Sequence, residues 1–147
     1  MILALALLLP QEEKELHDAI KAFAAWHDEA WDRALALDAT LVVKLIGAVN
    51  DADGRSVVVS ATVSHSGRDA AKAALAELYR DMDPKVEIEG ALIRGSDAML
   101  RGELSVSGPD GRRAHPLHAQ LKFDEARKIR HMTLTVVQAR PGPAPAR

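Results

Sequence analysis

Lys44 is the residue whose surroundings suggest chemistry most strongly. It lies in the segment 40–49, in which all the remaining residues except Thr40 are apolar or glycine. Burial in such a strand would disfavour the charged ammonium form and leave an amine able to act as a nucleophile or base. The amine could then form a Schiff base with a carbonyl substrate. Alternatively, Lys44 extends to solvent and protects the outer face of the strand from aggregation.

His27 is a second candidate for catalysis, because it lies at the centre of an apolar helical stripe. In a pocket, an imidazole can act as a general acid or base near neutral pH. Equally, it could be a hydrogen-bonded core residue or mark a break between two helices. We name four candidate substrate-binding residues, which could also be plain core: Trp26, Trp31, Tyr79 and Met82.

Two polar pairs on predicted strands complete the candidates. Arg101 and Glu103 are two residues apart, a spacing that places both side chains on one face of a strand. Such a pair could act on a substrate, although it is more often a solvated surface or a dimer rim. His115 and His118 are three residues apart, so they face opposite sides and cannot share a metal ion. We predict no metal site and no cofactor.

The composition argues against several classes of function. The chain has 147 residues, enough for one domain with a real core. Its formal net charge is −2, and no basic stripe offers contacts to phosphates, so we expect no nucleic-acid partner. It contains no cysteine, which excludes disulfides and thiolate chemistry. Aromatic residues make up only 3%, so any pocket is expected to be aliphatic.

The chemistry-bearing residues must be positioned by helices and strands that the hydrophobic pattern predicts. The expected order is helix, hairpin, helix and four antiparallel strands, which is an α+β arrangement. A capping pattern, Ser66 to Asp69, is expected to begin the later helix. The predicted helices span residues 11–37, with a break near His27, and 66–82; the predicted strands span 40–49, 56–64, 85–94, 98–107, 112–123 and 128–138.

The two ends of the chain are predicted to lie outside the main domain, which spans residues 10–138. Residues 1–9 are apolar throughout but too few to cross a bilayer, which needs about 20 residues. We expect them to pack on the domain or on a partner, with a secretion signal as the alternative. Residues 139–147 carry three prolines and are predicted to be a disordered tail. We expect no membrane association and a cytoplasmic location.

The predicted order of elements indicates an α+β fold in which the helices cover one face of a strongly curved, mostly antiparallel sheet. Helices of this kind can bury their apolar stripes only against the sheet. With a strong bend, the remaining space becomes a closed-ended cavity, so we predict a cone-shaped fold with an internal pocket for a small apolar molecule.

Short motifs give the chain a resemblance to a known superfamily. They are Leu37–Val42, Gly67–Ala70, Gly108–Arg113, Leu121–Asp124 and Lys128–Arg130. In their order and spacing they resemble the nuclear-transport-factor-two-like superfamily, which includes ketosteroid isomerase, limonene epoxide hydrolase and the SnoaL-like polyketide cyclases. The resemblance implies a pocket and a homodimer formed through the outer face of the sheet. It does not imply one activity, since fold and function separate easily.

The resemblance also gives positions to the candidate catalytic residues. When the chain is aligned on Gly47, Lys44 falls where ketosteroid isomerases have their aspartate base. The pair Arg101 and Glu103 is similar to the Arg-x-Asp pair of limonene epoxide hydrolases, but Leu134 stands where those enzymes have their last aspartate. The best-known reactions of this superfamily are therefore not expected here.

Three hypotheses about function remain. The first is an enzyme of the isomerase, lyase or hydrolase type that acts on an apolar substrate by proton transfer or lysine amine chemistry. It requires that Lys44 or His27 points into a cavity. The second is a ligand-binding or dimerisation module without chemistry. The third is an engineered variant of such a scaffold, in which Lys44 would supply the amine of a designed catalyst.

Overall fold

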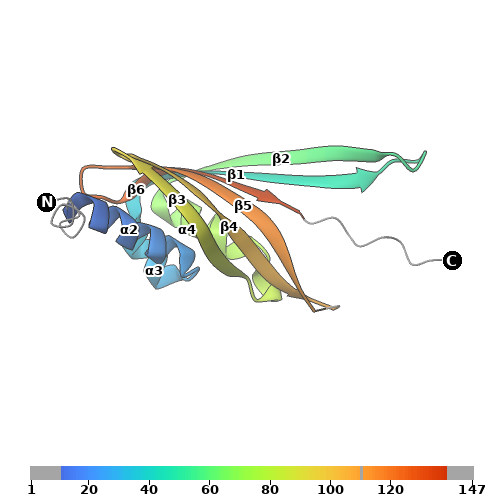
Figure 1. Cartoon of the computed structure of the whole chain (residues 1–147), viewed down its shortest axis with the longest axis horizontal. Coiled ribbons are helices and arrows are strands. Elements are labelled where there is room, and N and C mark those ends of the chain that lie inside the picture. The colour runs from blue at the N-terminus through green and yellow to red at the C-terminus, as the bar shows by residue number, and fades with distance from the viewer. Residues whose placement is uncertain (1–10, 110, 139–147) are drawn as a thin grey trace, which may run out of the picture.

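The computed structural model describes residues 11–109 and 111–138, so the predictions for residues 1–9 and 139–147 fall outside the described residues. Within the described part, three α-helices and a short 3₁₀ helix accompany the strands (Figure 1). No helix in this part is both long and apolar enough to cross a membrane. The helices are α2 (Gln11–Ala24), α3 (Asp28–Ala34), α4 (Arg68–Glu77) and η1 (Arg80–Met82).

Six strands form one sheet in the order β2-β1-β6-β5-β4-β3. All neighbouring strands are antiparallel except β1 and β6, which run parallel. The predicted α+β class and the antiparallel run of the last four strands are confirmed. The strands are β1 (Leu35–Asn50), β2 (Ser56–Ser66), β3 (Lys85–Arg94), β4 (Asp97–Gly108), β5 (Gly111–Phe123) and β6 (Ile129–Val137).

The sheet is less curved than expected. Strands β3, β4 and β5 bend beside the helices, whereas the hairpin of β1 and β2 runs outward from them (Figure 1). The sheet is not strongly curled, and only the part of the hairpin nearest β6 packs against α4. We call residues 47–59, the part of the hairpin beyond the last pair of β1 with β6, the arm.

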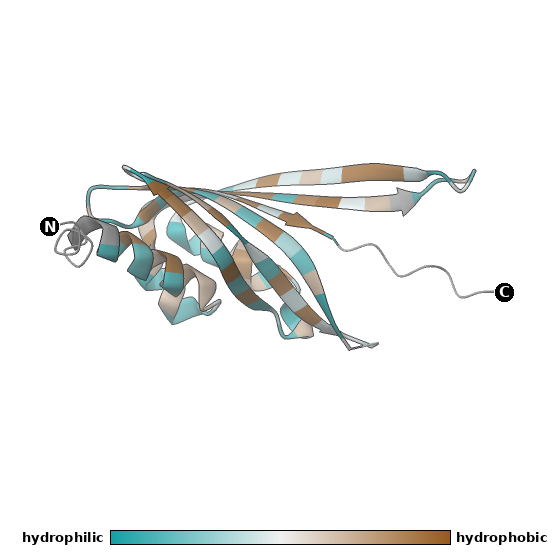
Figure 2. Cartoon of the chain, in the orientation of Figure 1, coloured by the Kyte–Doolittle hydropathy of each residue, from teal (hydrophilic) through white to brown (hydrophobic). Residues whose placement is uncertain are grey.

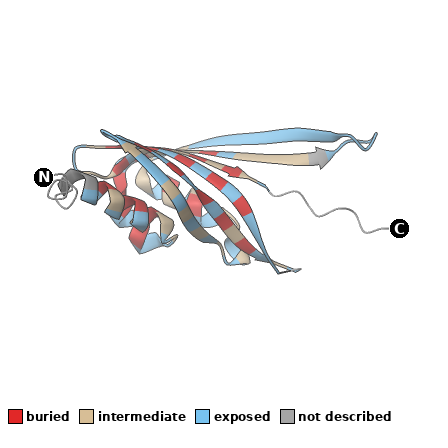
Figure 3. Cartoon of the chain, viewed as in Figure 1, coloured by how far each residue is buried: buried red, intermediate tan, exposed pale blue. Residues whose placement is uncertain are grey.

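The core lies between the helices and one face of the sheet, which we call the inner face. Along β4, β5 and β6 the buried side chains alternate with exposed or half-buried ones, as expected when one face is covered (Figure 3). Leu104, Leu117 and Leu134 of these strands are fully buried, as are Phe23 of α2 and Leu75 of α4. Burial of each such side chain stabilises the fold by about 1.5–3 kcal/mol.

The break between α2 and α3 is confirmed, and His27 marks it. Trp26 has a φ of 58°, in the left-handed region, so α2 cannot continue. His27 is the N-cap of α3, and its Nδ1 accepts a hydrogen bond of 3.2 Å from the backbone N–H of Ala30. This bond satisfies one of the free amides at the helix start.

Three predicted boundaries were wrong. The later helix, predicted to reach residue 82, ends at Glu77, because Leu78 is extended and Tyr79 is left-handed before the separate 3₁₀ helix. The first helical region ends at Ala34, and β1 already begins at Leu35, because residues 35–38 have extended backbone. The predicted Ser66 cap of α4 does not form either. Ser66 pairs with Thr40 in the sheet, and the N-cap of α4 is Gly67, with a φ of 93° and no side-chain bond. A glycine adopts this turn without the strain that a side chain would cause.

Candidate functional site

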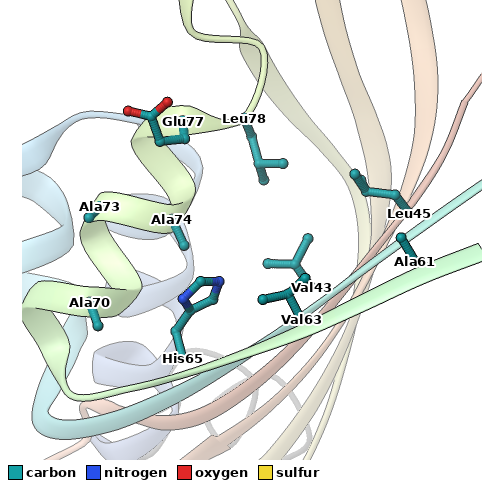
Figure 4. A pocket seen from close by; sticks show the side chains of 10 residues that line it. All are labelled: Val43, Leu45, Ala61, Val63, His65, Ala70, Ala73, Ala74, Glu77 and Leu78. Atoms are coloured by element: carbon teal, nitrogen blue, oxygen red, sulfur yellow. The ribbon is translucent and has the colours of Figure 1, made fainter.

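An apolar groove lies between the inner face of the β1–β2 hairpin and helix α4 (Figure 4). Its volume is about 540 Å³, within the range of about 300–1,000 Å³ that small-molecule pockets usually have. Nearly all of its wall is aliphatic. The lining residues are Val43, Leu45, Ala61, Val63, His65, Ala70, Ala73, Ala74, Glu77 and Leu78.

The two walls of the groove follow from the periodicities of strand and helix. On the sheet side, Val43 pairs with Val63 and Leu45 pairs with Ala61, so alternate residues of both strands face the same way. On the helix side, the lining residues lie three, four and seven positions after Ala70, which places them on one face of α4. Because Ala70, Ala73 and Ala74 have small side chains, this part of the helix leaves space instead of filling it.

Two titratable side chains border the groove, and they point in different directions. The imidazole of His65 lies on the β2 wall and points into the groove (Figure 4). The carboxylate of Glu77, near the end of α4, points away from it (Figure 4). The groove therefore offers a ligand one polar side chain within an aliphatic surface.

A second cavity, with a volume of about 440 Å³, contains two of the predicted substrate-binding residues, Tyr79 and Met82. The ring of Tyr79 stacks on that of His115, with centroids 5.2 Å apart and planes 11° from parallel. Burial lowers the pKa of His115, and the nearby charge of Arg113 lowers it further. The Tyr79 hydroxyl is buried and makes no hydrogen bond with the described residues.

The structure does not bring Lys44 to either cavity. Lys44 is exposed and lies between Thr62 of β2 and Thr135 of β6 on the outer face of the sheet. The desolvation required by the amine hypothesis is therefore missing. Arg101 and Glu103 are exposed on the same outer face, since their β4 neighbours Gly102 and Leu104 are buried. These three residues are remote from the groove because the helices cover the opposite face.

His27 and the two tryptophans form a separate structural cluster. His27 is exposed, and its ring nitrogen caps α3. Trp31 is 2% exposed, and its Nε1 donates a hydrogen bond of 3.1 Å to the carbonyl of Phe23. The ring of Trp26 packs edge-on against the rings of Phe23 and Trp31. Trp26 and Trp31 thus belong to the helical core, and His27 caps α3 at the surface. None of the three lines the groove.

His65 and the alanine face of α4 line the groove but were not among the predicted site residues. The signal for His65 is its odd-numbered position on β2, in register with Leu41, which places it on the inner face. The signal on α4 is the spacing of Ala70, Ala73 and Ala74. In residues 11–109 and 111–138, no three histidine, aspartate or glutamate side chains form a metal-binding cluster.

Comparison with known proteins identifies the fold. No protein-family model and no curated protein sequence matches this chain. Solved structures do match it. A chain from work on an enumerative algorithm for de novo design of proteins with diverse pocket structures has a TM-score of 0.61 and 14% identity, over 86% of this chain and 99% of that one.

Two natural proteins give similar agreement. A SnoaL-like polyketide cyclase candidate from Jannaschia sp. CCS1 has a TM-score of 0.60 and 12% identity, over 87% of this chain and 89% of that one. A protein with a ketosteroid isomerase-like fold from Catenulispora acidiphila, in complex with trimethylamine, has a TM-score of 0.57 and 19% identity, over 80% and 83%. The chain thus has the fold of SnoaL-like, ketosteroid isomerase-like and nuclear-transport-factor-two-like proteins.

Proposed function

We propose that this protein binds a small apolar molecule in the groove between α4 and the β1–β2 hairpin. The observation that carries the proposal is the aliphatic lining of a cavity of about 540 Å³ in which one imidazole points inward. Transfer of apolar surface from water into such a groove is favourable by about 25 cal/mol per Å². His65 adds a hydrogen bond for one polar group of the ligand, which fixes its orientation.

Binding without catalysis fits the groove better than the isomerase, lyase or hydrolase hypothesis. General acid–base catalysis needs a group within hydrogen-bond reach of the reacting atom and a means of stabilising the charge that develops. Lys44, Arg101 and Glu103 lie on the other face of the sheet, and Glu77 points away from the cavity. Among the described lining residues, this leaves His65 as the one inward titratable group.

A fluorescence titration with N-phenyl-1-naphthylamine, a neutral apolar dye, tests the proposal. The wild-type chain is expected to increase the dye's fluorescence saturably, and decanol is expected to displace it. Ala74→Phe would fill the groove from the α4 wall and is expected to weaken binding at least about tenfold, since the added ring takes the space that the dye would occupy. His65→Leu is expected to retain the dye and weaken displacement by decanol, because the hydroxyl loses its partner.

The matched control is Ala76→Phe, because Ala76 is exposed on the same helix and does not line the groove. It is expected to bind the dye as the wild type does. Thermal melting of each variant checks that it is folded. Equal binding by the Ala74→Phe and wild-type proteins would contradict the proposed site, and so would equal loss in both phenylalanine variants.

A further inference from the structure

The two edges of the sheet differ in how they are protected from pairing with another chain. Exposed edge strands usually carry charges, prolines or bulges that prevent such pairing. The β3 edge has a register shift between Ile88 and Gly90, together with charged side chains. Its charged residues are Lys85, Glu87, Glu89 and Arg94.

The β2 edge has none of these features. Its 11 residues contain no Lys, Arg, Asp, Glu or Pro. It pairs with β1 from Asn50↔Ser56 to Thr40↔Ser66 without a shift in register. Strand β2 is exposed along nearly its whole length (Figure 3). It therefore offers a straight, uncharged edge of a kind that is open to a further strand.

The hydrogen bonds flanking β2 indicate which of its backbone groups face outward. Asp51 N–H donates to the carbonyl of Arg55, and Gly67 N–H donates to that of Ala39. In an antiparallel ladder, bonded and non-bonded pairs alternate, so the odd-numbered residues of β2 bond to β1. The even-numbered residues direct their N–H and C=O groups to the open edge. Those at the centre of the strand are Val58, Ser60, Thr62 and Ser64.

This edge is complementary to a second copy of itself. In an antiparallel pair centred on Ala61, Ser60 of one copy lies opposite Thr62 of the other, and both have outward backbone groups. Serine and threonine side chains then face each other on the outer side, which favours cross-strand hydrogen bonds. On the inner side, Val59 of one copy lies beside Val63 of the other. No two like charges come opposite each other within the strand.

The pairing would also cover apolar surface that a single chain leaves in water. Val57 is 41% exposed, Val59 is 44% exposed and Val63 is 53% exposed, all on the inner face of β2. The apolar segments of the hairpin stand out on the arm in Figure 2. By contrast, the outer sheet face carries a row of polar side chains, among them Lys44 and Arg101. The edge is thus a better contact between copies than that face.

We propose that two copies of this chain pair through β2, antiparallel and centred on Ala61, to form one continuous sheet. Val63 and Ala61 line the apolar groove, so each copy then extends the sheet wall of the groove of the other. The pairing does not depend on a ligand, and it holds or fails independently of the proposed binding function.

A single-cysteine crosslink tests both the pairing and its register. The chain contains no cysteine, so Ala61→Cys provides one thiol per copy. Residue 61 would lie opposite itself in a non-hydrogen-bonded pair, with a Cα–Cα distance of about 4.5 Å, which a disulfide can bridge. The matched control is Val57→Cys, whose two copies would lie about 27 Å apart along the strands.

Under mild oxidation, the Ala61→Cys chain is expected to become a covalent dimer, whereas Val57→Cys is not. Crosslinking of neither variant, or of both to the same extent, would overturn the proposal. Light scattering on the untreated wild type is expected to give the mass of two chains. A monomer at all concentrations used for crosslinking would likewise overturn it.

A proline substitution separates this contact from any other. Thr62→Pro removes an N–H that faces outward and none that bonds to β1, so the fold is expected to remain. The variant is expected to be a monomer with the helix content of the wild type. Thr62→Val keeps the N–H and is expected to remain a dimer. A dimeric Thr62→Pro protein would place the contact elsewhere and overturn the proposal.

If Thr62→Pro fails to fold, the Ala61→Cys and Val57→Cys pair still decides the question.

Discussion

Gly102 is the residue at which the sheet tolerates no side chain. A Cβ atom there would lie 2.1 Å from the carbonyl oxygen of Glu87 and 3.1 Å from Cα of Ile88, both backbone atoms of β3. Gly102→Ala is therefore expected to lower the free energy of unfolding by at least about 1–3 kcal/mol, as overpacking does. Urea denaturation followed by circular dichroism measures the change.

Gly90, on the adjacent strand, is the control for that substitution. A Cβ at Gly90 would meet no atom within 4 Å. Gly90→Ala is expected to leave stability unchanged or to raise it slightly, because it restricts the unfolded chain. Similar losses in the two variants would show that the close approach of β3 to β4 is not the cause.

Burial of His115 is expected to make the free energy of unfolding depend on pH. Burial lowers the pKa of His115 below its ordinary value of 6.5. Below about pH 6.5, the unfolded chain binds a proton that the folded chain does not, so the free energy of unfolding falls until the pH drops below the folded pKa. His115→Phe keeps a ring to stack on Tyr79 and is expected to flatten this dependence between pH 7.5 and 5, measured by urea denaturation at each pH.

The control is His118→Gln, because His118 is exposed on the outer face of the same strand. It is expected to retain the wild-type dependence on pH. If the His118→Gln variant loses the slope while His115→Phe keeps it, burial of His115 is not its origin.

At the scale of elements, Lys72 joins α4 to α3. Its Nζ lies 2.6 Å from Oδ1 of Asp32 and 3.0 Å from Oδ1 of Asp28. The hydrogen bond to Asp32 raises the pKa of Lys72, and the same bond lowers the pKa of Asp32. This contribution of Asp32 is present at neutral pH and is lost as the pH falls through its folded pKa.

Lys72→Met is expected to lower Tm modestly, because Asp28 and Asp32 of α3 lose their lysine partner, although Asp32 keeps Arg68 at 3.7 Å. The difference from the wild type is expected to shrink in about 1 M NaCl, which screens exposed charges. Lys21→Met, at an exposed position of α2, is the comparison and is expected to change Tm less. Differential scanning calorimetry at two salt concentrations measures both. A loss that is independent of salt would point to packing of the lysine stem instead.

The elements were predictable because turn residues and hydrophobic periodicity mark them. Residues Asn50 to Gly54 indicate the turn of the hairpin, where the Asp51 carboxylate accepts bonds from two backbone N–H groups. The ends of elements were less predictable. The composition of residues 35–38 is compatible with a helix or a strand. They form a strand because Leu35 pairs with Ile129, a residue distant in the sequence.

At the scale of the whole molecule, the order of elements predicted the class of fold. Two of the three compared structures share this fold although they are only 14% and 12% identical to the chain in sequence. The site was not predictable in the same way. The face on which Lys44 lies depends on strand register, and a shift of one residue reverses it. An apolar run on both sides of Lys44 contains no information about that register. His65 faces the groove for the same reason that Lys44 does not.

The parallel contact of β1 with β6 has a consequence for how the protein acquires its structure. Residues 35–46 lie beside residues 129–137, which follow them much later in the chain, after four other strands and α4. During synthesis, the β1 edge that faces β6 therefore stays unpaired until nearly all of the described chain has been made. Contacts between such distant segments slow folding, since the long loop must close before they form. Refolding is thus expected to be limited by this closure, and the β1 edge stays open to water until β6 pairs with it.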